Sequence, residues 1–247
     1  MNITQQMNEL HLLGMAQQWQ SLTQTKEHLN LTLSDGMDLL LNAEKENRAV
    51  RRTQRLMHQA HFRYTASIEQ INYITARGLD KTLILSLADG IYITQGKSIL
   101  ITGPTGVGKS YIASALGHQA CLLGYTTLYC NIQKLLTQLK LARVDGSIFK
   151  VQKALYRKDL LILDDFGLQG LNEKQRIDYF EILEERHGRK STIYISQLPI
   201  HDWFDIIGDN TIADAIVDRV IHQSIKIDLK GESMRKMETT KQTERST

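Results

Sequence analysis

The residue types best suited to chemistry gather in one short run, Gly103-Pro104-Thr105-Gly106-Val107-Gly108-Lys109-Ser110. The run follows the pattern G-x-x-x-x-G-K-[ST], in which glycines let the backbone curl closely enough to point its N–H groups at phosphate oxygens. In such a loop Lys109 neutralises the β- and γ-phosphates, and the hydroxyl of Ser110 is a ligand for Mg²⁺. An apolar strand precedes the run and a helix follows it, so the positive end of that helix also faces the anion. The sequence therefore predicts a loop that binds ATP with Mg²⁺.

Two carboxylates, Asp164 and Asp165, follow the apolar run Leu160–Leu163. In a phosphate-loop protein the first carboxylate holds Mg²⁺, and the second orients and deprotonates the attacking water. Adjacent residues of a strand point to opposite faces, but the chain turns where a strand ends. We therefore expect both carboxylates to reach the nucleotide.

Gln197 follows an expected strand, Thr192–Ser196. Its amide could touch the γ-phosphate or the attacking water if this strand lies beside the strand that leads into the phosphate loop. Strand ends are normally polar, so the residue type alone is weak evidence for such a role.

Arg219 lies near the end of an expected helix, close to Asp214 and Asp218. One interpretation is an ordinary surface salt bridge with either aspartate. The other is an arginine finger that reaches the nucleotide of a neighbouring subunit. The spacing leaves both open.

Short apolar runs alternate with helical patterns from about residue 80 onward. This alternation predicts an α/β fold with a parallel sheet covered by helices on both faces. The expected strands are Lys97–Thr102, Thr126–Cys130, Asp159–Leu163, Thr192–Ser196 and Ser224–Leu229, and the expected helices are Val107–Leu123, Ile132–Ala142, Glu173–His187 and Ile212–Ile221.

The N-terminal third is polar with apolar residues at helical spacing. Ser34 or Asp35 can cap a helix from about Met37 to about Phe62, with Leu40, Leu41, Leu56 and Met57 in its apolar stripe. Four arginines at spacings of three and four share one face of that helix: Arg48, Arg51, Arg52 and Arg55. That face is either solvated or turned toward the phosphates of DNA.

Composition narrows the class of protein. The chain has 247 residues and a net charge of +3, a balance that permits nucleic-acid binding without demonstrating it. Cys121 and Cys130 are the only cysteines, so neither a disulfide framework nor a zinc site is expected. The sequence shows no secretory signal and no run that could span a bilayer, so we expect a cytoplasmic protein without membrane contact.

Residues 96–236 closely resemble the IstB-like ATP-binding helper proteins of insertion sequences, which are AAA+ ATPases related to DnaC-type helicase loaders and DnaA-type initiators. The stretches that carry the resemblance are GPTGVGKS (103–110), ALGHQAC (115–121), LARVDG (141–146), DLLILDDFGL (159–168), EILEERHGRKSTIYISQLP (181–199), IGDNTIADAIVDRVIH (207–222) and LKGESMRK (229–236). The N-terminal stretches LHLLGMAQQWQSL (10–22) and ENRAVRRTQRLMHQAHF (46–62) are also similar to the family's N-terminal region.

The resemblance implies a role for several single residues. Asp164 matches the Mg²⁺ position, and Asp165 the water-activating position, where most AAA+ proteins carry Glu. Gln197 matches a sensor position that is often Asn, and Arg219 matches the arginine finger. Arg235 falls in the region where the resemblance places a second sensor arginine. The chain ends too soon for the usual helical lid, which we expect to be reduced or absent.

The resemblance also implies an extra helix within Ile132–Lys153 that lines a DNA channel in relatives. Its candidate phosphate contacts are Lys140, Arg143, Lys150 and Lys153. For any one of them, an ordinary charged surface is an equally good interpretation.

The expected organisation is a helical N-terminal region (1–70) for partner, subunit or DNA contacts, an AAA+ ATPase domain (71–236) and a polar tail (237–247). The implied function is that of an ATP-dependent helper that oligomerises on duplex DNA and recruits or stimulates a transposase. A DnaC-like helicase loader is the main alternative. A small-molecule kinase and a nucleotide-gated module without hydrolysis are further alternatives.

Overall fold

The computed structural model describes residues 2–73, 77–222 and 224–234, and it divides into two compact units, Met1–Arg55 and Leu56–Thr247. The expected boundary near residue 70 falls inside the second unit. Leu56, Ala60, Ala66 and Ile68 are buried there, in the same apolar clusters as residues of the α/β core. The expected tail, 237–247, lies outside the described residues.

A sheet of five parallel strands forms the centre of the second unit, with the order β2-β3-β4-β1-β5. The strands are β1 (Ser98–Thr102), β2 (Thr127–Asn131), β3 (Leu160–Phe166), β4 (Ser191–Ser196) and β5 (Ser224–Asp228). The α/β class and the parallel sheet are confirmed. Strand β3 is longer than expected, because it continues through both aspartates to Phe166.

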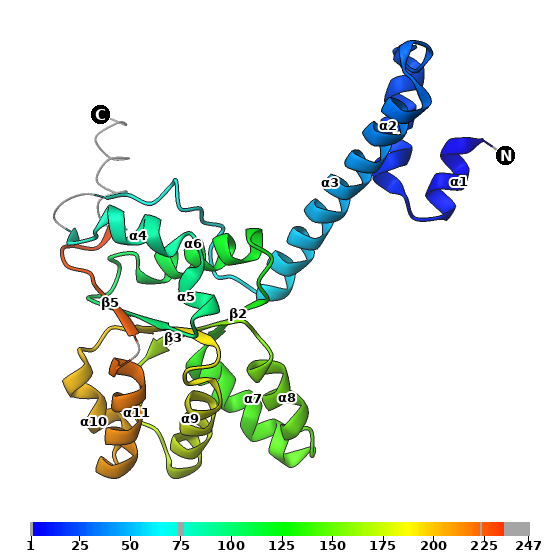
Figure 1. The fold of residues 1–247 in the computed structure, drawn as a ribbon. Coiled ribbons are helices and arrows are strands. Elements are labelled where there is room, and N and C mark those ends of the chain that lie inside the picture. Colours follow the sequence, from blue (N-terminus) through cyan, green and yellow to red (C-terminus); the bar gives the residue numbers. More distant parts are fainter. Residues whose placement is uncertain (1, 74–76, 223, 235–247) are drawn as a thin grey trace, which may run out of the picture. The chain divides into compact units, whose positions relative to one another are not determined.

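Helices cover both faces of this sheet (Figure 1). Alternate residues of β1 show the division, since Ile99 and Ile101 belong to one apolar cluster and Leu100 belongs to the other. The first cluster includes residues of α4 (Lys81–Leu87), α5 (Ile91–Thr94) and α6 (Lys109–Leu122). The second includes residues of α7 (Ile132–Val144), α8 (Ile148–Tyr156), α9 (Glu173–Arg186), α10 (Trp203–Ile207) and α11 (Asn210–His222), with a short 3-10 turn, η3 (Ile200–Asp202), before α10.

The first unit is helical, as the sequence indicates. It contains α1 (Ile3–Glu9), α2 (Leu13–Gln24), η1 (Glu27–Asn30) and most of α3 (Leu33–Ala60). Helix α3 begins earlier than expected, because Thr32 is its cap rather than Ser34 or Asp35. The Thr32 hydroxyl accepts a hydrogen bond from the backbone N–H of Asp35 at 3.2 Å and donates to its carboxylate at 2.6 Å.

A buried carboxylate joins α2 to α3 within this unit. Glu44 of α3 accepts hydrogen bonds from the backbone N–H groups of Gly14 at 2.8 Å and Met15 at 3.3 Å. Those groups lie in the first turn of α2, where no intrahelical acceptor is available and where the helix dipole favours a negative charge. Arg48 pairs with the other carboxylate oxygen at 2.7 Å. The apolar contacts are small and centre on Met15, Leu22 and Leu40.

No helix in the described part of the chain combines the length and the apolar character needed to cross a membrane.

Candidate nucleotide-binding site

The carboxyl ends of the parallel strands bring the predicted site residues to one edge of the sheet. The phosphate loop follows β1, the two aspartates lie just before the last residue of β3, and Gln197 follows β4. A parallel α/β sheet binds ligands at this edge because its loops and helix N-termini meet there.

Glycine is required in the phosphate loop at its first position. Gly103 has φ +138°, and a Cβ at this position would overlap the carbonyl oxygen of Leu229, in the segment after β5. Only glycine lets these two stretches of backbone approach so closely. Helix α6 begins at Lys109, so its free N–H groups lie at the end of the loop.

The ammonium group of Lys109 contacts backbone carbonyl groups of the phosphate loop itself. It donates hydrogen bonds to the carbonyl oxygens of Gly103 at 2.6 Å and Pro104 at 2.7 Å, and the residue is 7% exposed. Burial lowers the pKa of Lys109, while the nearby charges of Asp164 and Asp165 act in the opposite direction. A phosphate oxygen could replace these carbonyl groups as the acceptor.

A buried arginine, Arg77, supports the phosphate loop by hydrogen bonds to backbone carbonyl groups. Arg77 is 6% exposed and donates from one terminal nitrogen to the carbonyl oxygen of Val107 at 2.6 Å. Its other terminal nitrogen donates to the carbonyl oxygen of Asn72 at 2.5 Å. The loop is thereby connected to the segment that precedes the sheet.

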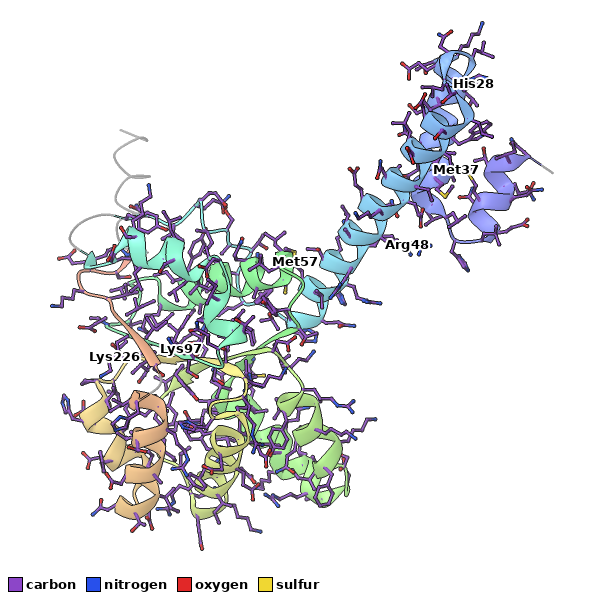
Figure 2. All side chains as sticks on the ribbon, viewed as in Figure 1. His28, Met37, Arg48, Met57, Lys97 and Lys226 are labelled. Atoms are coloured by element: carbon purple, nitrogen blue, oxygen red, sulfur yellow. The ribbon has the colours of Figure 1, made fainter. Side chains whose placement is uncertain are left out.

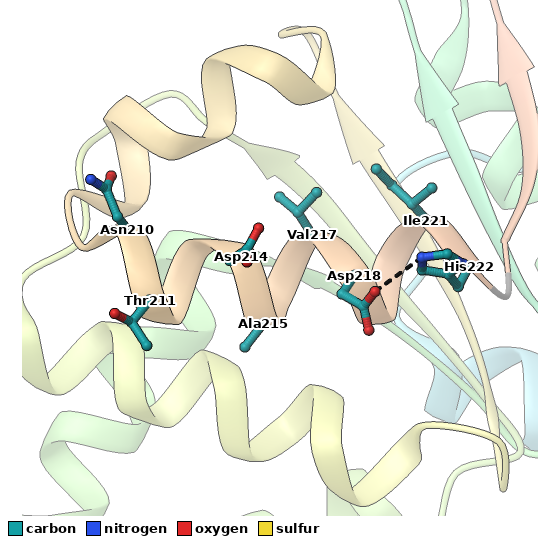
Figure 3. Close-up of a pocket in the computed structure, with 8 residues that line it drawn as sticks. All are labelled: Asn210, Thr211, Asp214, Ala215, Val217, Asp218, Ile221 and His222. Atoms are coloured by element: carbon teal, nitrogen blue, oxygen red, sulfur yellow. Dashed lines mark ion pairs between the residues drawn. The ribbon is translucent and has the colours of Figure 1, made fainter.

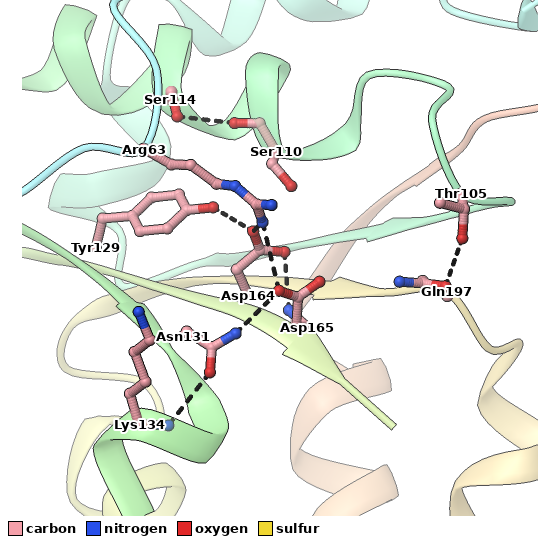
Figure 4. A network of polar contacts seen from close by, with 10 residues as sticks. All are labelled: Arg63, Thr105, Ser110, Ser114, Tyr129, Asn131, Lys134, Asp164, Asp165 and Gln197. Atoms are coloured by element: carbon pink, nitrogen blue, oxygen red, sulfur yellow. Dashed lines mark hydrogen bonds and ion pairs between the residues drawn. The ribbon is translucent and has the colours of Figure 1, made fainter. Parts of the chain in front are cut away.

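Asp164 is almost fully buried, with 1% of its surface exposed, and both of its carboxylate oxygens are hydrogen-bonded (Figure 4). One oxygen accepts the backbone N–H of Asp165 at 2.8 Å. The other accepts the Tyr129 hydroxyl and lies 3.3 Å from a terminal nitrogen of Arg63. Burial raises the pKa of Tyr129, and the charge of Asp164 raises it further, so the phenol keeps its proton and donates it.

The backbone conformation of Asp165 explains how the carboxylates of Asp164 and Asp165 both come close to Arg63. Its φ is +63°, and the pairing of β3 with β4 is irregular between Leu163 and Phe166. The left-handed conformation is costly for most residues and more accessible to Asp. It turns the Asp165 side chain toward Asn131, whose amide donates to it at 2.9 Å, and toward Arg63, at 3.4 Å.

Gln197 lies close to the phosphate loop. Its side-chain oxygen accepts a hydrogen bond from the Thr105 hydroxyl at 2.6 Å (Figure 4). The contact follows from the strand order, because β4 pairs directly with β1 and both loops begin at the same end. The adjacency that the sequence analysis required for Gln197 is therefore present.

The structure does not bring Arg219 to the phosphate loop of its own chain. Its guanidinium pairs with Glu184 of α9, donates to the Ala215 carbonyl at 3.0 Å and lies over the Phe180 ring at 4.7 Å. Of the two interpretations, the salt bridge is present, although its partner is neither Asp214 nor Asp218.

The exposed side of α11 lines an open pocket of about 760 Å³. Asp214 and Asp218 are among its lining residues, and Asp218 pairs with His222 (Figure 3). Arg219 lies on the same helix, and its side chain is 24% exposed in the single chain.

The candidate DNA contacts are separated into two groups. Arg48, Arg51, Arg52 and Arg55 are exposed on α3, and Figure 2 labels Arg48 on this helix. Arg48 also pairs with Glu44. Lys140, Lys150 and Lys153 are exposed on α7 and α8, whereas Arg143 of α7 pairs with Asp178 of α9. The expected extra helix within Ile132–Lys153 corresponds to α8, which runs on to Tyr156.

Sequence reasoning missed three side chains that contact the aspartates: Arg63, Tyr129 and Asn131. Asn131 directly follows the expected strand Thr126–Cys130, which is the one signal that was available for it. Arg63 is 101 residues from Asp164 along the chain, and no local pattern relates the two. Arg235, the candidate second sensor, lies outside the described residues.

Comparison with known proteins identifies the family. The family model for IstB-like ATP binding protein matches residues 5–242, nearly the whole chain. The chain belongs to the family of IstB-like ATP-binding proteins. The IstB-like assignment makes it an ATP-binding protein, as the resemblance of its motifs implied.

Individual relatives agree with this assignment. The IstB-like chain is 43% identical, over 235 residues, to a protein of Sinorhizobium fredii named as an insertion sequence ATP-binding protein, covering 95% of this chain and 96% of that one. It is 42% identical over 195 residues to the corresponding protein of insertion sequence IS1162 from Pseudomonas fluorescens, covering 78% and 84%. It is 28% identical over 222 residues to that of IS21 from Pseudomonas aeruginosa, covering 90% and 84%.

Solved structures support the fold. The DnaC helicase loader matches with a TM-score of 0.59 at 20% identity, over 68% of this chain and 98% of that one. The replication initiator DnaA bound to AMPPCP and single-stranded DNA matches with a TM-score of 0.58 at 20% identity, over 74% and 56%. The IstB-like chain therefore has the AAA+ core fold.

The residues at the sheet edge fit ATP and Mg²⁺ in their chemistry. Hard oxygen ligands suit Mg²⁺, and both the Ser110 hydroxyl and the Asp164 carboxylate are of this kind. The glycine-rich turn and the start of α6 supply N–H groups to an anion. Among the described residues, no group of three His, Cys, Asp or Glu side chains forms a separate metal site.

Proposed function

We propose that this IstB-family chain is a Mg²⁺-dependent ATPase that assembles on duplex DNA and acts as the helper of a transposase. The proposal rests on one observation above all. A phosphate loop and two carboxylates share one edge of the sheet in a chain whose relatives are named as insertion sequence ATP-binding proteins. The partner transposase is inferred from those names and from the family resemblance.

Each site residue has a proposed role that its contacts support. The loop from Gly103 to Ser110 and Lys109 would bind the phosphates, and Ser110 with Asp164 would hold Mg²⁺. Asp165 would orient and deprotonate the attacking water. Gln197, which reaches the loop through Thr105, would sense the γ-phosphate.

Arg219 would act between subunits. Its contacts within the chain are to α9 and α11 rather than to its own phosphate loop, and α11 borders an open pocket. An arginine that completes the site of a neighbouring subunit would make hydrolysis depend on assembly. Such an arrangement explains why a homo-oligomer, and not a monomer, would be the active form.

The first experiment is the mass of the protein in solution, measured by light scattering with and without a slowly hydrolysed ATP analogue. Each condition is repeated on duplex DNA and on single-stranded DNA. We expect a large assembly that requires both nucleotide and duplex. A monomer under every condition would contradict both the assembly and the role of Arg219.

The same measurement tests the helicase-loader alternative, which is raised by the similarity of the fold to that of the DnaC helicase loader. Assembly on single strands alone would favour a loader, and capture of a replicative helicase rather than a transposase would support that result. Phosphate release by the assembled protein separates an ATPase from a nucleotide-gated module. Transfer of phosphate to a nucleoside or metabolite would instead favour the kinase alternative.

A further inference from the structure

Arg63 is the cation in direct contact with the two carboxylates of the site. Its terminal nitrogen lies 3.3 Å from one oxygen of Asp164 and 3.4 Å from one oxygen of Asp165 (Figure 4). Lys109, the expected cation of the site, instead donates to the carbonyl groups of Gly103 and Pro104. The negative charge of the aspartates is therefore balanced by a residue outside the phosphate loop.

Three hydrogen bonds to Asp164 use three of the roughly four lone-pair sites of its carboxylate. One carboxylate oxygen accepts the backbone N–H of Asp165, and the other accepts both Tyr129 and Arg63. A carboxylate oxygen has two lone-pair sites, so the oxygen shared by Tyr129 and Arg63 is fully used. A metal ion that binds this oxygen must replace one of the two donors. An ion on the other oxygen of the same carboxylate would still lie close to the Arg63 guanidinium and be repelled by it.

Electrostatics decides which donor leaves. Mg²⁺ binds oxygen at about 2.1 Å, so the ion and a guanidinium on the same carboxylate oxygen would be only a few ångströms apart. Repulsion between two cations at that separation is strong in a partly buried site. The neutral hydroxyl of Tyr129 suffers no such repulsion, whereas Arg63 does.

Arg63 is also able to leave. Its side chain is 44% exposed, and the residue lies beyond α3, which ends at Ala60, in a segment outside helices and strands. Asp164, by contrast, is buried in β3, and Asn131 and Tyr129 belong to β2. The arginine is the more exposed partner in these contacts, and water can solvate it when it is displaced.

We propose that Arg63 is a built-in counterion of the metal site: it neutralises Asp164 and Asp165 when Mg²⁺ is absent, competes with Mg²⁺ for Asp164, and is displaced when Mg·ATP binds. This inference rests on the proposed role of Asp164 in holding Mg²⁺. It adds a residue that controls how strongly nucleotide binding depends on the metal.

The test is the ratio of two dissociation constants of a fluorescent ATP analogue, the Kd measured in EDTA divided by the Kd measured at saturating Mg²⁺. In Arg63→Met we expect this ratio to rise at least threefold. The uncompensated carboxylates repel metal-free nucleotide, and no cation competes with Mg²⁺. For Arg63→Lys we expect a ratio between that of Arg63→Met and that of the wild type. Arg189→Met removes an exposed arginine paired with Glu185 and should keep the wild-type ratio.

An equal loss of affinity in both conditions would overturn the proposal, because it would make Arg63 a phosphate ligand. An unchanged ratio would overturn it as well. If Arg63→Met does not fold, hydrogen exchange of wild-type residues 61–66 replaces it. We expect faster exchange with Mg·nucleotide than with metal-free nucleotide, and equal exchange would contradict displacement.

Mn²⁺ alone, followed by electron paramagnetic resonance, separates this inference from the proposed function. If wild type binds no nucleotide, the proposed function fails, but the competition is still measurable. Arg63→Met should bind Mn²⁺ at least threefold more tightly than wild type and than Arg189→Met. Equal Mn²⁺ affinity in all three proteins would refute the counterion role.

Discussion

At the scale of single residues, the hydrogen-bond acceptors of the buried Lys109 ammonium would change when nucleotide binds. Its ammonium is held by two carbonyl groups of its own loop, and burial lowers its pKa. Carbonyl groups carry only partial charges, so anionic phosphate oxygens are stronger acceptors for the same ammonium. Binding of nucleotide would therefore exchange weaker hydrogen bonds for stronger ones.

Replacement of Lys109 by alanine should weaken binding of ATP by at least tenfold, which corresponds to about 1.4 kcal/mol or more. The variant loses the cation that balances the phosphates while it keeps the N–H groups of the loop. Titration with a fluorescent ATP analogue measures the effect, and Lys97→Ala, an exposed lysine, is the matched control. Normal binding by Lys109→Ala would refute the assignment of the phosphate loop.

Arg219 could affect hydrolysis either through its ion pair with Glu184 or through its proposed contact with the nucleotide of a neighbouring subunit, and two variants separate these roles. Arg219→Ala should retain ATP binding and lose hydrolysis in the assembled protein. Glu184→Gln removes the same ion pair but keeps the arginine, so it should retain hydrolysis. A partly exposed pair of this kind contributes about 0–1 kcal/mol to stability, so both variants should fold. Equal hydrolysis by the two variants would reduce Arg219 to a structural role.

At the scale of elements, the crossing of α2 on α3 depends on the absence of a side chain. A Cβ at Gly14 would overlap the carbonyl oxygen of Ala43 and lie 2.7 Å from Cβ of Asn47. The close approach also brings the first turn of α2 within reach of the Glu44 carboxylate. One small residue thus permits both the packing and the cap.

Gly14→Ala should destabilise the N-terminal unit by about 1–3 kcal/mol, because backbone atoms must move to admit the methyl group. Gly36→Ala is the control, since a Cβ there meets nothing within 4 Å. Alanine in an open helical position should stabilise α3 by about 0.5–1 kcal/mol. Hydrogen exchange of residues 13–24 in both variants measures the local stability. Similar exchange in Gly14→Ala and wild type would show that the crossing tolerates a side chain.

At the scale of the whole molecule, the proposed assembly brings nucleotide, subunit and DNA surfaces together. The α7–α8 pair presents Lys140, Lys150 and Lys153, while Arg143 is engaged with Asp178. Lysines that meet phosphates contribute affinity with little sequence preference, and their effect falls as salt rises. These three lysines are therefore better candidates for DNA contact than Arg143.

The double variant Lys150→Ala/Lys153→Ala should bind duplex DNA more weakly on every sequence tested. Each lost phosphate contact should reduce the slope of log affinity against log salt by about 1. The measurement is fluorescence anisotropy at several salt concentrations, with Lys174→Ala on α9 as the exposed control. An unchanged slope would place the DNA surface elsewhere on the protein.

Local patterns in the sequence were sufficient to predict the five strands and the helices α6, α7, α9 and α11 of the α/β core, but not α4, α5 or α10. The run from Gly103 to Ser110 identifies the phosphate loop, and alternating apolar runs locate the five strands with small differences at their ends. These features are local, because a strand or a glycine turn depends mainly on neighbouring residues. Pattern alone failed at the start of α3, where Ser34, Asp35 and Thr32 are all plausible caps.

Only the tertiary structure decided how those elements meet. The order of the strands places Gln197 beside Thr105, and the left-handed conformation of Asp165 turns its carboxylate toward Arg63. The pairing of Arg63 with Asp164 joins residues 101 positions apart. Such contacts depend on packing and on the neutralisation of buried charge, which are properties of the folded chain and leave no periodic pattern in the sequence.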